Sequence, residues 1–195
     1  MANTRIGIIG HGHVGSALER GLTRAGFEVR AVGSDPTAVR ETAAWAETVV
    51  LAVPFGALDE VSKLINPVVD GKPVVDVTNA LASDMSLAVG FTTSGAEELQ
   101  KKLPTAHVVK AFNTVFAKHM ATGHLGDQPL TAFVAGDDLA AKRSVLEMAT
   151  AIGFDAIDAG PLRNARLIEP MAAFNIQLGY GLNMGTEIGL ELLHH

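Results

Sequence analysis

The sequence has 195 residues, of which 48% are hydrophobic, and it carries a formal net charge of −6 with no cysteine. Such a chain is globular and long enough for one domain with an appendage, and it excludes disulfides, thiolate metal sites and cysteine nucleophiles. The acidic balance excludes a nucleic-acid surface. No apolar stretch reaches the roughly 20 residues of a membrane span and no signal peptide is evident, so we expect no membrane contact and a cytoplasmic location.

Strands and helices are predicted to alternate along the chain. Apolar and β-branched runs predict strands at about 5–9, 27–33, 48–53, 73–77, 107–112, 130–136 and 154–158. Helical spacing predicts helices at 16–22, 37–44, 55–65, 94–102 and 138–151, and the Ser94 to Glu97 spacing is a capping box. This alternation predicts an α/β fold, a Rossmann doubly wound parallel sheet with right-handed crossovers.

The character of the chain changes near Asn113. We therefore place a dinucleotide-binding domain at 1–112 and a small C-terminal α/β portion at 113–195, which closes the cleft and contributes to dimerisation. This portion is predicted to end in a mostly helical tail from Ala165 to roughly Leu193.

The predicted tail is unusual because it carries four glycines, at positions 179, 181, 185 and 189. Each interior glycine costs a helix about 1 kcal/mol relative to alanine. Close packing has to offset that cost. We therefore expect the apolar segment from Ala172 to Leu190 to be buried against the sheet or a second subunit, which predicts a homodimer.

The most informative motif is the glycine pattern directly after the first predicted strand. Gly10, Gly12 and Gly15 form G-x-G-x-x-G between a β-branched strand and a helix start. In a dinucleotide-binding loop, the first glycine allows a tight turn, the second lets the backbone approach a pyrophosphate, and the third lets the helix pack on the strand. An ordinary glycine-rich turn is the alternative interpretation.

Other polar residues are weaker candidates. His11 and His13 lie inside the glycine loop, where they either donate to a phosphate or ribose or occupy permissive positions. Thr78 and Asn79 follow a predicted parallel strand, and its carboxyl end is where open α/β sheets bind ligands, although helix caps are also common there. The spacing of the other histidines does not favour a metal site.

Two charged residues near the start of the predicted tail lie three positions apart. Arg166 and Glu169 share one face of a helix at this spacing and are able to pair. A structural ion pair and a contact to substrate are both open interpretations.

Two longer motifs carry a family resemblance. The segment 158–169 reads DAGPLRNARLIE and the segment 108–114 reads VVKAFNT. Together with the N-terminal glycine motif, they resemble the NADP-dependent oxidoreductases of the coenzyme F420 type. The second segment also resembles the cytoplasmic domain of the six-transmembrane metalloreductases. The resemblance covers essentially the whole chain.

The resemblance implies where a nicotinamide cofactor binds. The loop Gly10–Gly15, which includes Val14, would hold the pyrophosphate, and Ser34 would lie at the 2′ position of the adenine ribose. Val53 and Pro54 would flank the nicotinamide ribose. Asn113 and Thr114 would border the nicotinamide ring.

The resemblance also implies NADP as the cofactor, with NAD as an alternative. Members of the family usually have Ser-Arg after the second strand, where this chain reads Ser34-Asp35-Pro36. An aspartate there favours a free ribose hydroxyl and repels a phosphate. Arg40 is one of the nearest cations that would replace the missing arginine.

The function that follows from the resemblance is hydride transfer between NADP(H) and a second planar ring, a deazaflavin or flavin. Such a transfer proceeds by proximity of the two rings and needs no protein acid or base, so we assign no catalytic residue. The only partners expected are this small redox acceptor and a second subunit. The alternative is a non-catalytic sensor that binds NAD(P)H and regulates a partner.

Overall fold

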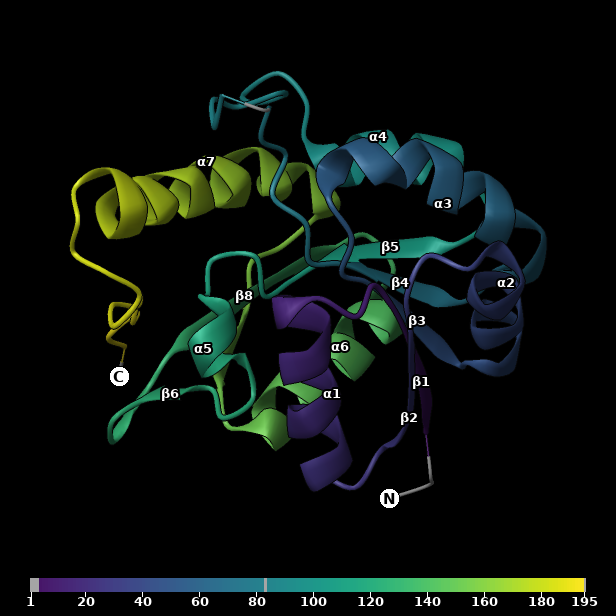
Figure 1. Cartoon of the computed structure of the whole chain (residues 1–195), viewed down its shortest axis with the longest axis horizontal. Coiled ribbons are helices and arrows are strands. Elements are labelled where there is room, and N and C mark those ends of the chain that lie inside the picture. The colour runs from purple at the N-terminus through teal and green to yellow at the C-terminus, as the bar shows by residue number, and fades with distance from the viewer. Residues whose placement is uncertain (1–3, 83, 195) are drawn as a thin grey trace.

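The strands and helices of the protein alternate along the chain (Figure 1). The computed structural model describes residues 4–82 and 84–194. The strands are β1 (Arg5–Ile9), β2 (Glu28–Val32), β3 (Thr48–Leu51), β4 (Pro73–Asp76), β5 (His107–Lys110), β6 (His124–Leu125), β7 (Gln128–Pro129), β8 (Thr131–Gly136) and β9 (Asp155–Asp158). The helices are α1 (His13–Arg24), α2 (Pro36–Trp45), α3 (Leu58–Ile65), α4 (Gly95–Lys102), α5 (Ala117–Met120), α6 (Leu139–Ile152) and α7 (Ala165–Ile176).

One sheet contains seven strands in the order β2-β1-β3-β4-β5-β8-β9. The first five are parallel to one another, in the arrangement of a Rossmann fold. The predicted doubly wound α/β fold is confirmed, and within the C-terminal portion β8 runs antiparallel to β5. A parallel crossover needs a dozen or more residues, usually a helix. Here the four-residue α5 and the β6–β7 hairpin turn the chain back instead.

The sheet also continues past the predicted boundary between residues 112 and 113. β8 pairs directly with β5, and β9 extends the sheet parallel to β8. The C-terminal portion therefore adds strands to the sheet that the N-terminal portion begins.

Helices cover both faces of this sheet, with α1, α5 and α6 on one side and α2, α3 and α4 on the other (Figure 1). Successive side chains of a strand point to opposite faces. In β3, Val50 packs in the first core while Val49 and Leu51 pack in the second. This explains why the strand is continuously apolar. No helix among residues 4–82 and 84–194 is long and apolar enough to cross a membrane.

Side-chain caps fix the starts of three helices. Asp35 accepts a hydrogen bond from the amide of Ala38 at 2.8 Å and starts α2. Ser94 starts α4 and accepts from the amide of Glu97 at 3.2 Å, which confirms the predicted capping box. In the same way Asp138 caps α6.

The C-terminal tail differs from its prediction. A π-helical turn, Gln177–Gly181, follows α7, and the predicted helix is wrong beyond that turn. The glycines explain the difference: Gly185 has a φ of +77°, and Gly189 packs directly on the side chain of Leu130. The segment instead runs beside β8, where the carbonyl of Leu190 accepts from the amide of Thr131 at 2.9 Å.

The expected burial of the tail is not met within one chain. Phe174 and Tyr180 are each 62% exposed, and Leu182 is 61% exposed. Within the chain, only part of the tail is covered, for example Ala172 and Gly179.

Candidate functional site

The carboxyl ends of the five parallel strands lie along one edge of the sheet, in the sheet order. Open α/β sheets bind ligands at this edge. From β2 to β5, the residues that follow the strands include Ser34, the glycine loop, Val53, Thr78 and Asn113. Neighbouring strands lie about 4.8 Å apart, so the row from β2 to β5 is roughly 19 Å long.

Each glycine of the loop has a different steric environment. Gly10 has a φ of +106°, and a Cβ added there would collide with the carbonyl oxygen of Ala52. A Cβ at Gly15 would collide with the carbonyl oxygen of Gly10. A Cβ at Gly12 would meet nothing within 4 Å. The first and third glycines are thus required by the fold, whereas the second leaves space outside the protein for a ligand.

A cavity of about 330 Å³ lies beside this loop. Six predicted residues line it: Gly10, His11, Gly12, Ser34, Val53 and Pro54. The rest of the wall is mostly apolar and comprises Ile9, Gly33, Val39, Ala52, Ala57, Glu60, Val61 and Leu64. The part of the cavity wall that α3 and the residue before it contribute was not predicted from the sequence. The spacing of Ala57, Val61 and Leu64 was the available signal, because residues four and then three apart share one face of a helix.

Other predicted residues lie next to the cavity without lining it. His13, Val14 and Gly15 form the first turn of α1. Asp35 is held as the N-cap of α2. Arg40 lines a separate hollow with residues of α2 and the end of α3. Among the described residues that line the main cavity, none is an arginine or lysine.

His11 is the one histidine of the loop that lines the cavity. Its Nε2 lies 2.9 Å from the Glu19 carboxylate on α1. This contact holds the ring at the mouth of the cavity.

The remaining predicted residues lie at the ends of β4 and β5, where Asn79 is partly buried and Thr78, Asn113 and Thr114 are buried. Thr78 and Asn113 are each 4% exposed. The Asn113 amide nitrogen is 3.3 Å from the Asn79 side-chain oxygen and 3.5 Å from the carbonyl of Ile168. The carbonyl of Thr114 accepts from Asn175 on α7. These residues thus connect the sheet edge to the last helix.

Two buried polar atoms at this place have no hydrogen-bond partner among the described residues, the Thr78 Oγ1 and the Asn113 Oδ1. Buried polar groups are normally paired, and an unpaired one costs about 1–3 kcal/mol. Phe112, directly before Asn113, has a φ of +64°, a strained conformation for a bulky residue. Strain and unpaired groups that occur together are typical of a ligand site.

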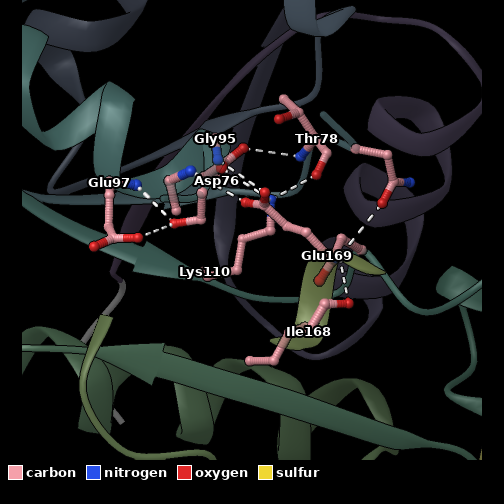
Figure 2. Close-up of polar contacts among 11 residues, drawn as sticks. Asp76, Thr78, Gly95, Glu97, Lys110, Ile168 and Glu169 are labelled. Atoms are coloured by element: carbon pink, nitrogen blue, oxygen red, sulfur yellow. Dashed lines mark hydrogen bonds and ion pairs between the residues drawn. The ribbon is translucent and has the colours of Figure 1, made fainter. Parts of the chain in front are cut away.

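Beneath these atoms lies a cluster of three buried charged residues (Figure 2). Lys110 of β5 donates to the Asp76 carboxylate at 2.9 Å and to the Thr78 carbonyl at 2.6 Å. Its Nζ also lies 3.1 Å from Glu169 of α7. The side chains are 0%, 0% and 1% exposed in the order Lys110, Asp76, Glu169. Sequence analysis did not identify this cluster.

The cluster keeps its lysine charged. Burial lowers the pKa of Lys110, but the nearby Asp76 and Glu169 carboxylates outweigh burial and raise the pKa above its ordinary value. Glu169 also accepts from the amides of Gly95 and Ala96 at 2.8 and 3.1 Å, at the start of α4. It therefore joins α7, α4 and β5.

The possible pairing of Arg166 with Glu169 does not occur. Arg166 instead donates two hydrogen bonds to Glu97 of α4, at 2.8 and 2.7 Å, and Glu169 turns inward to Lys110. A bidentate partner was available to Arg166 on α4, and Glu169 contacts the buried Lys110 and the amides of Gly95 and Ala96 instead. The hydrogen bonds from Arg166 lower the pKa of Glu97 below its ordinary value.

These features define a class of protein: a Rossmann fold with a glycine loop, an adjoining cavity and a buried polar edge, where folds of this class bind dinucleotides. Residues 5–80 match the family described as NADP oxidoreductase coenzyme F420-dependent. Over these residues the chain is similar to the NADP-dependent oxidoreductases of this type.

Individual proteins agree with this assignment. A solved structure from Arthrobacter sp. FB24, a proposed F420-dependent NADP-reductase, is 26% identical with a TM-score of 0.89, covering 98% of this chain and 100% of that chain. Metalloreductase STEAP3 of Rattus norvegicus is 31% identical over 85% of this chain and 36% of its own length. Metalloreductase STEAP2 of Homo sapiens is 31% identical over 56% of this chain and 21% of its own length. The chain thus spans about a third or less of these metalloreductases.

Proposed function

We propose that the chain binds NADP(H) along the carboxyl edge of the sheet and passes a hydride between its nicotinamide and a deazaflavin or flavin-like ring. The observation that carries this proposal is the edge itself. It has a glycine with open space and a cavity at one end and two unpartnered buried polar atoms at the other. The row of strand ends is roughly 19 Å long and connects these two places.

At the open end, the chain's own groups match the phosphates and the adenine ribose. The backbone at Gly12 and the first turn of α1 present amide groups toward a pyrophosphate, where the positive end of the helix dipole favours an anion. The Ser34 hydroxyl lies at the cavity wall for the ribose. The apolar side of α3 gives the adenine a dry surface.

At the buried end, the unpartnered atoms match a primary carboxamide. A carboxamide has one carbonyl acceptor and an NH₂ donor. The Thr78 hydroxyl is able to donate to such a carbonyl, and the Asn113 Oδ1 is able to accept from such an NH₂. The Asn113 amide nitrogen faces two acceptors, which leaves its oxygen directed to the ligand. Thr78 and Asn113 would thus orient the nicotinamide ring.

The cofactor supplies the chemistry when bound: its C4–H bond breaks, the hydride goes to the acceptor ring, and a proton from water completes reduction of that ring. The protein's part is to hold the rings close together and exclude water. No protein group has to gain or lose a proton in this step.

The test follows the hydride. NADPH deuterated at C4 is mixed with the protein and with a deazaflavin, with FMN, or with a ferric chelate, because the curated relatives are metalloreductases. We expect slower single-turnover oxidation than with unlabelled NADPH, and deuterium in the deazaflavin product. If bound NADPH is oxidised by no acceptor faster than free NADPH, the enzyme proposal fails and a non-catalytic sensor replaces it.

The proposal includes a homodimer formed through the C-terminal segment. The support is the set of large apolar residues exposed there: Leu167, Phe174, Tyr180, Leu182 and Met184. A soluble protein rarely leaves such a group in water. Sedimentation should give twice the chain mass, and Phe174→Glu should give the single mass. Leu139→Glu, on α6 and 75% exposed compared with 62% for Phe174, is the control that should stay dimeric.

A further inference from the structure

The buried cluster does not balance its own charge. Lys110 contributes one positive charge, and Asp76 and Glu169 contribute one negative charge each, so the three groups sum to −1. The start of α4 offsets part of this, because its amides donate to Glu169 and a helix N-terminus carries roughly half a positive charge. The opposite charges of the neighbouring Glu97 and Arg166, which form an ion pair, add up to zero. The interior beneath the site therefore stays negative.

This negative cluster is attached directly to the atoms that would face the nicotinamide. Asp76 accepts from the amide of Thr78 at 2.9 Å, and Lys110 donates to the carbonyl of the same residue. Asn113 reaches the carbonyl of Ile168, the residue before Glu169. Both unpartnered atoms thus belong to residues held by the cluster or by its immediate neighbour, and Figure 2 shows Thr78 beside Asp76 and Lys110.

A structural role alone needs only one carboxylate. A single Asp76–Lys110 pair would neutralise the ammonium, and a neutral side chain is able to accept from the start of α4. A second buried carboxylate adds a desolvation cost. The extra charge therefore requires a reason other than stability.

We propose that the Lys110–Asp76–Glu169 cluster is an electrostatic positioning element that favours the oxidised, positively charged nicotinamide over the neutral reduced one. The inference rests on the proposed function, because it requires the ring to bind at this edge. A negative interior lowers the free energy of the cationic ring and leaves the neutral ring almost unaffected. Bound NADPH is thereby made a stronger hydride donor.

The measurement that tests this is the ratio of the dissociation constants for NADP⁺ and NADPH, obtained by calorimetric titration without any acceptor. Glu169→Gln and Asp76→Asn each remove one unit of negative charge from a different element. At an effective dielectric near 20, a unit charge acting over about 12 Å corresponds to about a tenfold change in such a ratio, which sets the scale expected for a nearby ring. We expect both variants to raise the ratio by about this factor, because NADP⁺ loses affinity while NADPH does not.

The control is Glu97→Gln, on the same helix start but paired with a partly exposed arginine. It should change the ratio far less than the other two variants do, because water screens the partly exposed Arg166 charge that it leaves unpaired. The wild-type protein gives a second test that needs no variant: NADP⁺ should bind more tightly than NADPH. If NADPH binds more tightly to the wild type, the inference is overturned even where the variants do not fold.

The outcomes separate the inference from the proposed function. If the wild type binds neither form, the proposed function fails. If both forms bind and the two constants change together in Glu169→Gln and Asp76→Asn, the cluster is purely structural, and the inference alone is wrong.

Discussion

The two ends of the ligand edge are built in opposite ways. At the ends of β1, β2 and β3, a cavity of about 330 Å³ has mostly apolar walls and a glycine with open space above it. At the ends of β4 and β5, the side chains of Asp76, Lys110 and Glu169 are buried at 0–1% exposure. Their contacts connect β4, β5 and α7 to the start of α4. One end is open to receive a ligand, and the other is assembled before any ligand arrives.

This difference shows at which end ligand affinity and folding free energy depend on the same residues. At the open end, a change in the loop alters the space for a ligand without removing a contact within the protein. At the buried end, the same groups hold the fold and surround the unpartnered atoms of Thr78 and Asn113. Substitutions at the two ends should therefore separate into changes of affinity and changes of folding free energy.

The largest expected effect is on stability at the buried end. Lys110→Met leaves Asp76 and Glu169 buried without a counter-charge, and breaking a buried ion pair in this way costs about 3–5 kcal/mol. Urea unfolding should show this loss. Lys101→Met is the matched control, since Lys101 pairs with Glu98 at the surface and should change stability by less than about 0.5 kcal/mol. Equal losses in the two variants would contradict the comparison.

The next effect is on binding at the open end. Gly12→Val places a side chain where nothing lies within 4 Å, so the protein should fold normally while the pyrophosphate is blocked. Losing charge-assisted hydrogen bonds to a phosphate costs about 3 kcal/mol, which is at least a hundredfold in affinity. Calorimetric titration with NADPH measures this loss of affinity. Gly56→Val, also with open space but outside the cavity wall, should bind normally; a Gly12→Val protein of unchanged affinity would show that the loop is only a turn.

A smaller effect concerns the choice between NADPH and NADH. Asp35 caps α2 and places a carboxylate beside Ser34. Asp35→Asn keeps a capping side chain and removes the charge, so the affinity for NADPH should rise relative to NADH by about fivefold, or roughly 1 kcal/mol. Asp35→Arg should raise the affinity for NADPH relative to NADH further. It should also lower the free energy of unfolding by about 1 kcal/mol, because the capping hydrogen bond of α2 is lost. An unchanged preference in both variants would place the 2′ position of the ribose elsewhere.

Local signals in the sequence were enough to predict most of the fold. The apolar run of β3 and the capping box of Ser94 and Glu97 each depend on neighbours within a few residues, and both are confirmed. The open cavity was also largely predictable, because the glycine pattern locates it within one β-α unit. Less local features were not predicted: the antiparallel direction of β8 depends on how the chain returns to the sheet, and the path of the tail depends on the side chains that its glycines contact.

The buried cluster was beyond prediction for the same reason. Asp76, Lys110 and Glu169 are separated by 34 and 59 positions in the sequence, and no spacing rule brings them together. The rule for helix faces instead suggested Arg166 as the partner of Glu169, three residues away. The long-range partner was preferred because a buried lysine has a larger requirement for a carboxylate than a surface arginine.

The smallest expected effect is at the ion pair between Glu97 and Arg166, which joins α4 to α7 near the surface. Glu97→Gln keeps the capping box, since glutamine is also suited to that position, and removes only the charge. The pair is partly exposed, at 18% for Glu97 and 38% for Arg166, so its loss should cost at most about 1 kcal/mol at pH 7.

The pKa of Glu97 is lowered in the folded state, chiefly by the hydrogen bonds from Arg166. The contribution of the Glu97 carboxylate to the free energy of unfolding is therefore complete above the ordinary glutamate pKa of about 4.3. It is lost as the pH falls through the lower pKa that Glu97 has in the folded state. Urea unfolding of the wild type and the variant should differ at pH 7 and converge in strong acid, while Glu98→Gln should show a smaller difference at pH 7, because the Glu98–Lys101 pair is more exposed. A stability difference that stays constant down to acid pH would mean that Glu97 acts by packing and not by charge.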